Sequence, residues 1–260
     1  MTTTTAKKAV LFDLGNTLWH IPERPPVDEI RKETVRRIFG LLEKWGVKPE
    51  GELRFLGRDI RLAIGAADKA AYESDQISPD IPALVQSLVA KKGLDISLEQ
   101  SAELWHTWNL EGSFFGRRLF DDAIETLDEL RKRGLRFGCV TNRPYGGPTF
   151  LQEVTELGLN DYFEVMSVSC DLGYMKPHAK IYEHALTAMN IAPEETVMVG
   201  DSLIADVRGA QVLGMTGVWN RHHEIDESNT DHVEPDFVID ELSELLHLPI
   251  FDMNGRTPAG

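Results

Sequence analysis

Five polar residues stand at positions from which they could take part in one reaction. They are Asp13, Thr141, Lys176, Asp201 and Asp206. A carboxylate such as that of Asp13 can act as a nucleophile, and two further carboxylates are hard oxygen ligands suited to Mg²⁺. A hydroxyl group and an ammonium group can bind the oxygens of a phosphoryl group. Together, these residue types suit phosphoryl transfer, in which positioning and charge stabilisation carry most of the catalysis.

These residues follow short apolar runs that the sequence pattern predicts as buried strands. We expect strands at residues 9–12, 135–140, 163–168, 196–199, 216–219 and 237–239. We expect helices between them at residues 122–133, 149–157, 179–189 and 205–213. This alternation predicts an α/β fold with a doubly wound parallel sheet. Because ligands bind outside the carboxyl ends of the strands in such a sheet, the polar residues should converge at one edge.

Residues 19–117 differ from the rest of the chain in pattern. Apolar residues recur at a helical period in the segments 30–45, 53–72, 81–90 and 98–110, and no β-rich run interrupts them. We therefore expect an all-helical domain at 19–117, inserted into an α/β core of residues 1–18 and 118–250. Residues 251–260 are expected to form a loose C-terminal tail.

Composition excludes several classes of protein. The chain has 42 acidic residues against 27 Lys and Arg, a formal net charge of −15, which argues against binding to nucleic acid or to an anionic membrane. No apolar run approaches the ~20 residues of a membrane helix, and the first residues lack the apolar middle of a signal peptide. Two cysteines give neither a disulfide framework nor a plausible zinc site. We expect a cytoplasmic protein, as a monomer or a homodimer.

Each of the five polar residues also has an ordinary structural interpretation. Asp13 could cap a turn, Thr141 could cap a helix, and Lys176 could lie in solvent at the start of a helix. Acidic residues such as Asp201 and Asp206 are favoured by the dipole at a helix N-terminus. For these interpretations to hold, each residue would have to lie at a consecutive strand end by coincidence. A shared site explains their positions together, and we therefore favour it.

The same residues resemble, in order and spacing, the four motifs of the haloacid dehalogenase-like hydrolase superfamily. The resemblance covers residues 8 to about 240 and rests on residues 12–17 (FDLGNT), 140–142 (VTN), 173–177 (GYMKP) and 200–206 (GDSLIAD). The helical insert resembles the cap of the subgroup that carries it directly after the first motif. The resemblance thus implies a cap domain at 19–117 and a catalytic core at 1–18 and 118–250. The resemblance implies Asp13 and Lys176 as catalytic residues, Leu14, Thr141, Asn142 and Lys176 in substrate binding, and Asp13, Gly15, Asp201 and Asp206 as ligands of Mg²⁺.

One position departs from the family pattern. Phosphatases of the superfamily have a second aspartate two residues after the nucleophile, where it serves as general acid and then base, and this chain has Gly15 there. The backbone carbonyl remains as a metal ligand, but the proton relay of the side chain is lost. A good leaving group, an acid on the substrate, or a linker or cap residue such as His20, His106 or Arg24 could compensate.

Three functions are compatible with these features. The favoured one is a Mg²⁺-dependent phosphatase that acts on a small phosphorylated metabolite through an aspartyl-phosphate. The second is a metal-independent 2-haloacid dehalogenase, in which Asp13 attacks carbon; Gly15 favours it, whereas Asp201 and Asp206 disfavour it. The third is a non-catalytic protein that binds a phosphate ligand and keeps the fold. The sequence does not identify the substrate. Arg143, next to the second motif, could contact the substrate, but we expect a solvated side chain.

Overall fold

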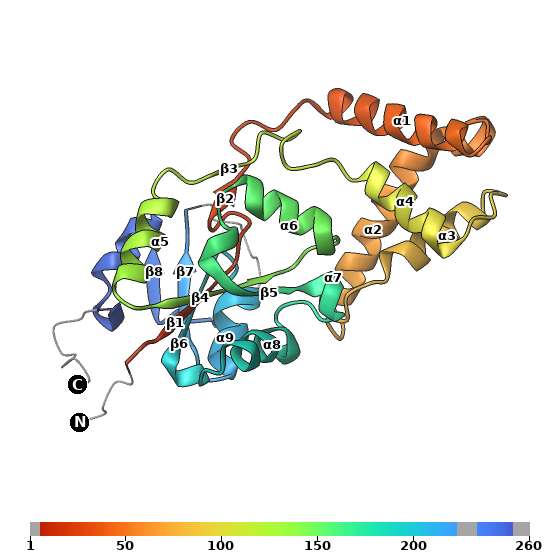
Figure 1. Ribbon diagram of the computed structural model, residues 1–260. Helices are drawn as coiled ribbons and strands as arrows, with labels where there is room; N and C mark the ends of the chain where they lie inside the picture. Colours follow the sequence, from red (N-terminus) through yellow and green to blue (C-terminus); the bar gives the residue numbers. More distant parts are fainter. Residues whose placement is uncertain (1–5, 223–232, 252–260) are drawn as a thin grey trace. The chain divides into compact units, whose positions relative to one another are not determined.

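A parallel sheet of six strands forms the centre of the larger of two units in the computed structural model, which describes residues 6–222 and 233–251 (Figure 1). The strand order is β5-β4-β1-β6-β7-β8, and each neighbouring pair is parallel. The strands are β1 (Ala9–Phe12), β4 (Arg136–Thr141), β5 (Phe163–Val168), β6 (Thr196–Gly200), β7 (Thr216–Asn220) and β8 (Phe237–Ile239). The predicted α/β fold with a parallel sheet is confirmed.

The central strand β1 is apolar because helices cover both faces of the sheet. Ala9, Val10, Leu11 and Phe12 are each 0% exposed, as expected for a strand in a doubly wound sheet. Ala9 and Leu11 belong to a buried cluster that includes Tyr182 of α8. The helices that flank the sheet are α5 (Ala123–Lys132), α6 (Gly147–Glu156), α7 (Ser169–Leu172), α8 (Ala179–Met189) and α9 (Gly209–Val212) (Figure 1).

The segment after β6 departs from the predicted helix at 205–213. It begins as a π-helix, Leu203–Arg208, and continues as α9. The Val207 N–H reaches back to the carbonyl of Ser202 at 3.2 Å, five residues away, which gives the wider turn. This turn carries Asp206. Short 3₁₀-helices complete the unit at Asn160–Tyr162, Pro193–Glu195, Leu242–His247 and Pro249–Phe251.

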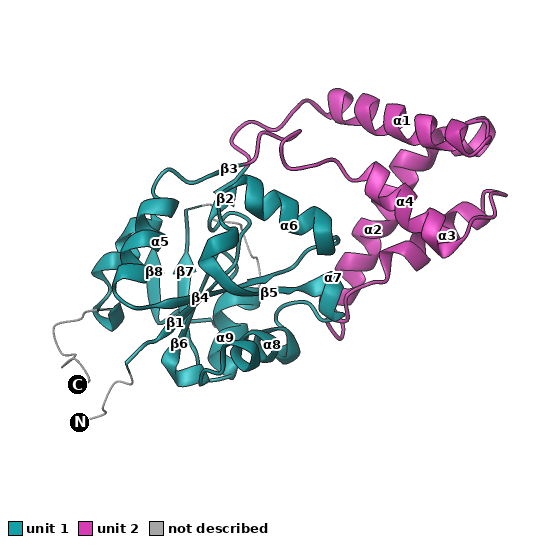
Figure 2. Cartoon of the chain, viewed as in Figure 1, with its two compact units in different colours: residues 1–20, 118–260 teal, residues 21–117 magenta. Residues whose placement is uncertain are grey.

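Residues 21–117 form the second unit, coloured magenta in Figure 2. Within it, every described element is helical: α1 (Val27–Lys44), a 3₁₀-helix (Gly51–Phe55), α2 (Leu56–Tyr72), α3 (Ile81–Ala90) and α4 (Leu98–Trp108). The side chains of Asp80 and Ser97 accept hydrogen bonds from backbone N–H groups at the starts of α3 and α4, as helix caps do. The helical nature predicted for this part of the chain agrees with these elements.

The two crossings between the units lie beside a small ribbon that the pattern did not predict. Strand β2 (Trp19–His20) pairs with β3 (Arg118–Leu119) in antiparallel register. Two-residue strands are too short to show a period of two in the sequence. Because the ribbon belongs to the α/β unit, that unit extends to residue 20 rather than the expected 18.

The expected loose tail, residues 251–260, lies outside the described residues except for its first member. Phe251 ends a 3₁₀-helix and is 2% exposed, so the chain is still packed at that position, contrary to the expectation. Among the described residues, none of the helices has both the length and the apolar character needed to span a membrane.

Candidate active site

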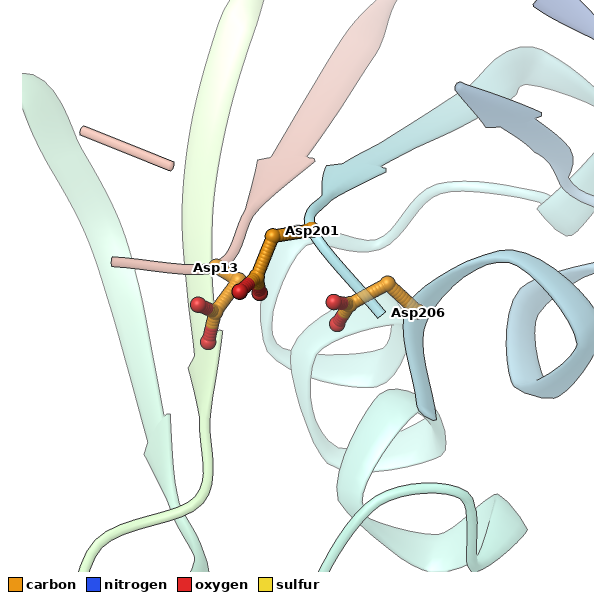
Figure 3. Close-up of side chains that lie close together, drawn as sticks. All are labelled: Asp13, Asp201 and Asp206. Carbon is orange, nitrogen blue, oxygen red and sulfur yellow. The ribbon is translucent and has the colours of Figure 1, made fainter. Parts of the chain in front are cut away.

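Three carboxylates meet at the carboxyl end of the central strands. Asp13 follows β1, Asp201 follows the neighbouring strand β6, and Asp206 lies on the π-helix, with one oxygen of each within 4.8 Å of the others. Asp201 and Asp206 point toward Asp13 (Figure 3). The Asp13 N–H donates to the carbonyl of Val199 at 2.9 Å, so the parallel pairing of β1 with β6 fixes the backbone of Asp13.

Lys176 places a positive charge among these carboxylates. Its Nζ lies 2.7 Å from Asp13 Oδ1 and 2.6 Å from Asp206 Oδ1, and the residue is only 2% exposed. Burial opposes the charged form of the lysine, but the attraction of the two carboxylates outweighs burial and raises its pKa above the ordinary value. The ammonium group is therefore held in its charged form.

One lysine does not balance three carboxylates. With its three carboxylates ionised, the group has three negative charges against one positive charge, an excess of two. Burial, together with the nearby Asp13 carboxylate, raises the pKa of Asp201 and of Asp206, although Lys176 acts in the opposite direction on both. A cluster of carboxylate oxygens with this excess fits a hard divalent cation, which would relieve the repulsion.

The side chain of Asn142 fixes the backbone of Lys176. Its Oδ1 accepts from the Lys176 N–H at 2.7 Å, and its Nδ2 donates to the Lys176 carbonyl at 3.0 Å. The family resemblance implied a part in substrate binding for Asn142. Because its amide already makes one hydrogen bond at each end to Lys176, we assign contact with a substrate to the backbone N–H of Asn142.

The turn after β6 is shaped around Asp206. Its Oδ2 accepts from the Ser202 N–H at 3.0 Å, and the Ser202 hydroxyl in turn accepts from the Ala205 N–H at 3.0 Å. A Cβ atom placed on Gly200 would lie 2.1 Å from Asp206 Cγ, which is far too close. Glycine at position 200 therefore makes room for this carboxylate, a role that its place in the motif alone did not reveal.

Asn16 also contacts the cluster, although the sequence motifs gave it no role. Its Nδ2 donates to Asp201 Oδ2 at 3.2 Å, and its backbone has φ 54°, in the left-handed region. Asparagine tolerates this conformation better than most residues. The sequence feature that could have predicted this contact is the position of Asn16, three residues after Asp13, because a turn there points back toward the end of the neighbouring strand.

The remaining predicted residues lie around the same strand ends. Leu14 is fully buried, and its carbonyl accepts the N–H groups of residues 17, 18 and 19, so that this carbonyl is used by the turn itself. Thr141 ends β4 and is 2% exposed. Gly15 bridges to Trp19, and a Cβ placed on it would meet only Trp19 Nε1, at 3.9 Å.

Comparison with known proteins places this chain in a family. The model of the haloacid dehalogenase-like hydrolases matches residues 7–214. A glyceraldehyde 3-phosphate phosphatase of Methanopyrus kandleri is 30% identical over 92% of this chain and 95% of its own length. The protein of the same name from Pyrococcus furiosus is 40% identical, but the match spans 48% of this chain and about half, 52%, of that protein.

A solved structure gives the same result for the fold. The phosphatase of this family from Thermococcus onnurineus superposes with a TM-score of 0.55 at 27% sequence identity, covering 92% of this chain and 96% of its own. The match includes the helical unit, because it extends over nearly the whole of both chains. The resemblance of the sequence motifs to the haloacid dehalogenase-like hydrolases is confirmed at the level of the family.

Proposed function

The chain belongs to the haloacid dehalogenase-like hydrolase family, and we propose that it is a Mg²⁺-dependent phosphatase acting on a small phosphorylated metabolite. The observation that carries the proposal is the position of Lys176 Nζ, within 2.7 Å of both Asp13 and Asp206 in a cluster that keeps an excess of negative charge. The relatives named as phosphatases of small metabolites support the substrate class.

In this proposal Asp13 is the nucleophile. Its carboxylate attacks phosphorus, the bond from phosphorus to the alcohol oxygen breaks, and the alcohol leaves after gaining a proton. Water then attacks the phosphorus of the aspartyl-phosphate, which releases inorganic phosphate and restores Asp13. Lys176 holds Oδ1 of Asp13, and so orients the carboxylate and offsets charge during both attacks.

The phosphate oxygens would be bound at the ends of β1 and β4. The Thr141 hydroxyl and the backbone N–H groups of Leu14 and Asn142 are the donors that we assign to them, with the Lys176 ammonium nearby. All four residues belong to the α/β unit. Leu14 lies just beyond the end of β1, Thr141 and Asn142 lie at the end of β4, and Lys176 is held there by the Asn142 side chain. Donors fixed by the sheet need little rearrangement when charge develops in the transition state.

The metal ligands that we assign are the carboxylates of Asp13, Asp201 and Asp206 and the carbonyl of Gly15. The donor set fits Mg²⁺, because it is made of oxygens and carries an excess of two negative charges. When bound, the ion neutralises the repulsion between the anionic nucleophile and the anionic phosphate.

Gly15 has no side chain that could protonate the leaving group, so the proton must come from another group. Of the three residues suggested for this role, His20 lies in the α/β unit, where its ring stacks on that of Phe120 at 4.3 Å. His106 and Arg24 belong to the helical unit. The substrate itself, through a good leaving group or an acidic group of its own, is the fourth source.

One set of assays separates the three functions. The purified protein is given para-nitrophenyl phosphate, sugar phosphates and 2-chloropropionate, with and without Mg²⁺, beside the matched variant Asp13→Asn. Phosphate release that requires Mg²⁺ and is lost in the variant supports the proposal. Chloride release without Mg²⁺ would establish the dehalogenase instead. Tight phosphate binding without turnover of any substrate would identify a binding protein.

The metal assignment has a test that does not depend on activity. Asp201→Asn removes one of three carboxylates that repel one another, so the metal-free variant should unfold at a higher temperature than the wild type. Added Mg²⁺ should stabilise the wild type and have little effect on the variant. Asp68→Asn is the matched control, because burial alone raises the pKa of that carboxyl in α2. An equal Mg²⁺ shift in wild type and Asp201→Asn would contradict the assignment.

A further inference from the structure

Arg143 lies directly after the proposed phosphate-binding residues, and its surroundings differ from those expected. The sequence predicted a solvated side chain, but the side chain is only 11% exposed. Its backbone is also held: the N–H donates to the Ser169 hydroxyl at 2.9 Å, and the same hydroxyl donates to the Arg143 carbonyl at 3.0 Å. Ser169 begins α7, after β5, so Arg143 is fixed to the end of the next strand of the sheet.

The guanidinium group is enclosed by aromatic rings and one carboxylate. It lies over the rings of Trp19, Tyr145 and Phe150 at 5.3, 4.6 and 5.6 Å from the centroids, which is the range of cation–π contacts. One nitrogen pairs with Glu153 at 3.1 Å, and Glu153 also accepts from the Tyr145 hydroxyl at 2.7 Å. A planar guanidinium can stack flat on rings while it pairs with a carboxylate, whereas a lysine ammonium has no plane with which to stack.

Trp19 connects this group to the nucleophile. Its backbone N–H donates to the Leu14 carbonyl at 3.0 Å, and its carbonyl accepts from the Asn16 N–H at 2.7 Å. Both hydrogen bonds close the turn that follows Asp13. Trp19 is itself 3% exposed, so its ring is a fixed surface rather than a mobile side chain. The Arg143 guanidinium therefore rests on the loop of Asp13 while its backbone continues the loop of Thr141.

We propose that Arg143 is a positioning residue, which sets the separation between the Asp13 carboxylate and the donors of the Thr141–Asn142 segment. The proposal rests on the proposed function for its kinetic consequence, but its structural consequence is independent of it. The two loops are more than a hundred residues apart in sequence, and parallel pairing of β1 with β4 fixes only the strands that precede them. The contact between Arg143 and Trp19 joins the loops beyond the strand ends.

The buried ion pair complicates a single substitution. Arg143→Met leaves Glu153, which is 5% exposed, without its counter-charge, and a lone buried carboxylate destabilises the fold. The variant Arg143→Met with Glu153→Gln removes both charges and keeps an acceptor for Tyr145. Arg143→Lys keeps the charge and loses the planar stack. The matched control is Arg136→Met with Glu164→Gln, an exposed ion pair at the opposite end of β4.

The experiment measures thermal stability, steady-state phosphatase kinetics and amide hydrogen exchange on these variants. We expect the Arg143/Glu153 double variant to unfold near the wild-type temperature, yet to show kcat lowered by about 10- to 100-fold with a smaller change in KM, because a displacement of ~1 Å costs on that order. Arg143→Lys should recover part of the loss. The control pair should behave as the wild type does.

Hydrogen exchange tests the positioning role of Arg143 even if the wild type has no phosphatase activity. The N–H groups of Asn16 and Trp19 should exchange at least about tenfold faster in the Arg143/Glu153 double variant, since their loop loses its support. Faster exchange in a protein without phosphatase activity would refute the proposed function and uphold the positioning role. Unchanged exchange at both amides, or wild-type kcat in a stable double variant, would overturn the positioning role.

Discussion

Replacing Gly15 by aspartate should speed the hydrolysis of phosphate esters whose alcohol is a poor leaving group. The substitution puts a carboxyl group two residues after Asp13, where the chain now has none. The structure has space for the first atom of this side chain: a Cβ on Gly15 would meet only Trp19 Nε1, at 3.9 Å, an ordinary contact. The backbone of Gly15 is also outside the left-handed region, so a side chain brings no strain there.

The charges already in the site indicate why a carboxyl group at position 15 should act as the general acid. Lys176 is held by two carboxylates, and these keep it charged, so it is a poor proton donor for the alcohol. A new carboxyl group would enter the environment that raises the pKa of Asp201 and Asp206, which favours its acid form. A positioned acid contributes about 10²–10⁴-fold, equivalent to about 3–5 kcal/mol of barrier.

The assay compares two substrates with different needs for an acid. Para-nitrophenolate leaves readily without a proton, whereas the alkoxide of a sugar phosphate does not. Gly15→Asp should therefore raise kcat for the sugar phosphate by about 10²-fold or more while changing kcat for para-nitrophenyl phosphate much less. Gly15→Asn is the matched control, since it has nearly the same shape and no acid. Equal rates for the Asp and Asn variants, or no change in either, would refute the reasoning.

Three further predictions concern steric fit, thiol chemistry and stability. Gly200→Ala should lower activity at least about tenfold, because its Cβ would overlap the Asp206 carboxylate. Gly40→Ala, in open space inside α1, should stabilise the protein by ~0.5–1 kcal/mol in urea unfolding. Wild-type activity of Gly200→Ala, or a loss of stability in Gly40→Ala, would contradict the packing argument. Cys170 should react with iodoacetamide at pH 8 roughly 40-fold more slowly than an unperturbed thiol, since burial raises its pKa to about 12; mass spectrometry of native and unfolded protein checks this, and equal rates would refute it. Thr126→Val should raise the free energy of unfolding by about 1 kcal/mol, because it removes a buried hydroxyl that has no partner among the described residues; a loss of stability would count against it.

The carboxylate cluster could be predicted from the sequence because parallel strands end at one edge. Asp13 and Asp201 each follow a run of apolar residues long enough to be identified as a buried strand, and the topology then brings their side chains together. The motif spacing placed Asp206 on the next turn. These residues are positioned by regular elements, whose periodicity is visible in the sequence.

Other contacts could not be predicted, because they join irregular segments far apart in the chain. The amide of Asn142 meets the backbone of Lys176 across 34 residues, and Arg143 meets Trp19 across more than a hundred. Neither pair shows a periodic signal. The prediction that Arg143 is solvated was wrong because of both distant and local contacts. Trp19 is far away in the chain, whereas Tyr145 and Phe150 lie two and seven residues after Arg143, where the chain enters α6.

The arrangement of charges indicates that this part of the chain is adapted to chemistry rather than to stability. Lys176 and Asp206 are 2% and 1% exposed, and removing such charges from water destabilises a fold unless each is fully paired. The pairing here is incomplete, with three carboxylates to one ammonium group. The cluster keeps its form because backbone groups hold its members: Asn142 holds Lys176, and the Ser202 N–H holds Asp206. Asp201 lies outside the two ion pairs of Lys176, so a substitution that removes its carboxylate should stabilise the metal-free protein while it weakens the site. Such a conflict between stability and function is expected where buried charge serves a reaction.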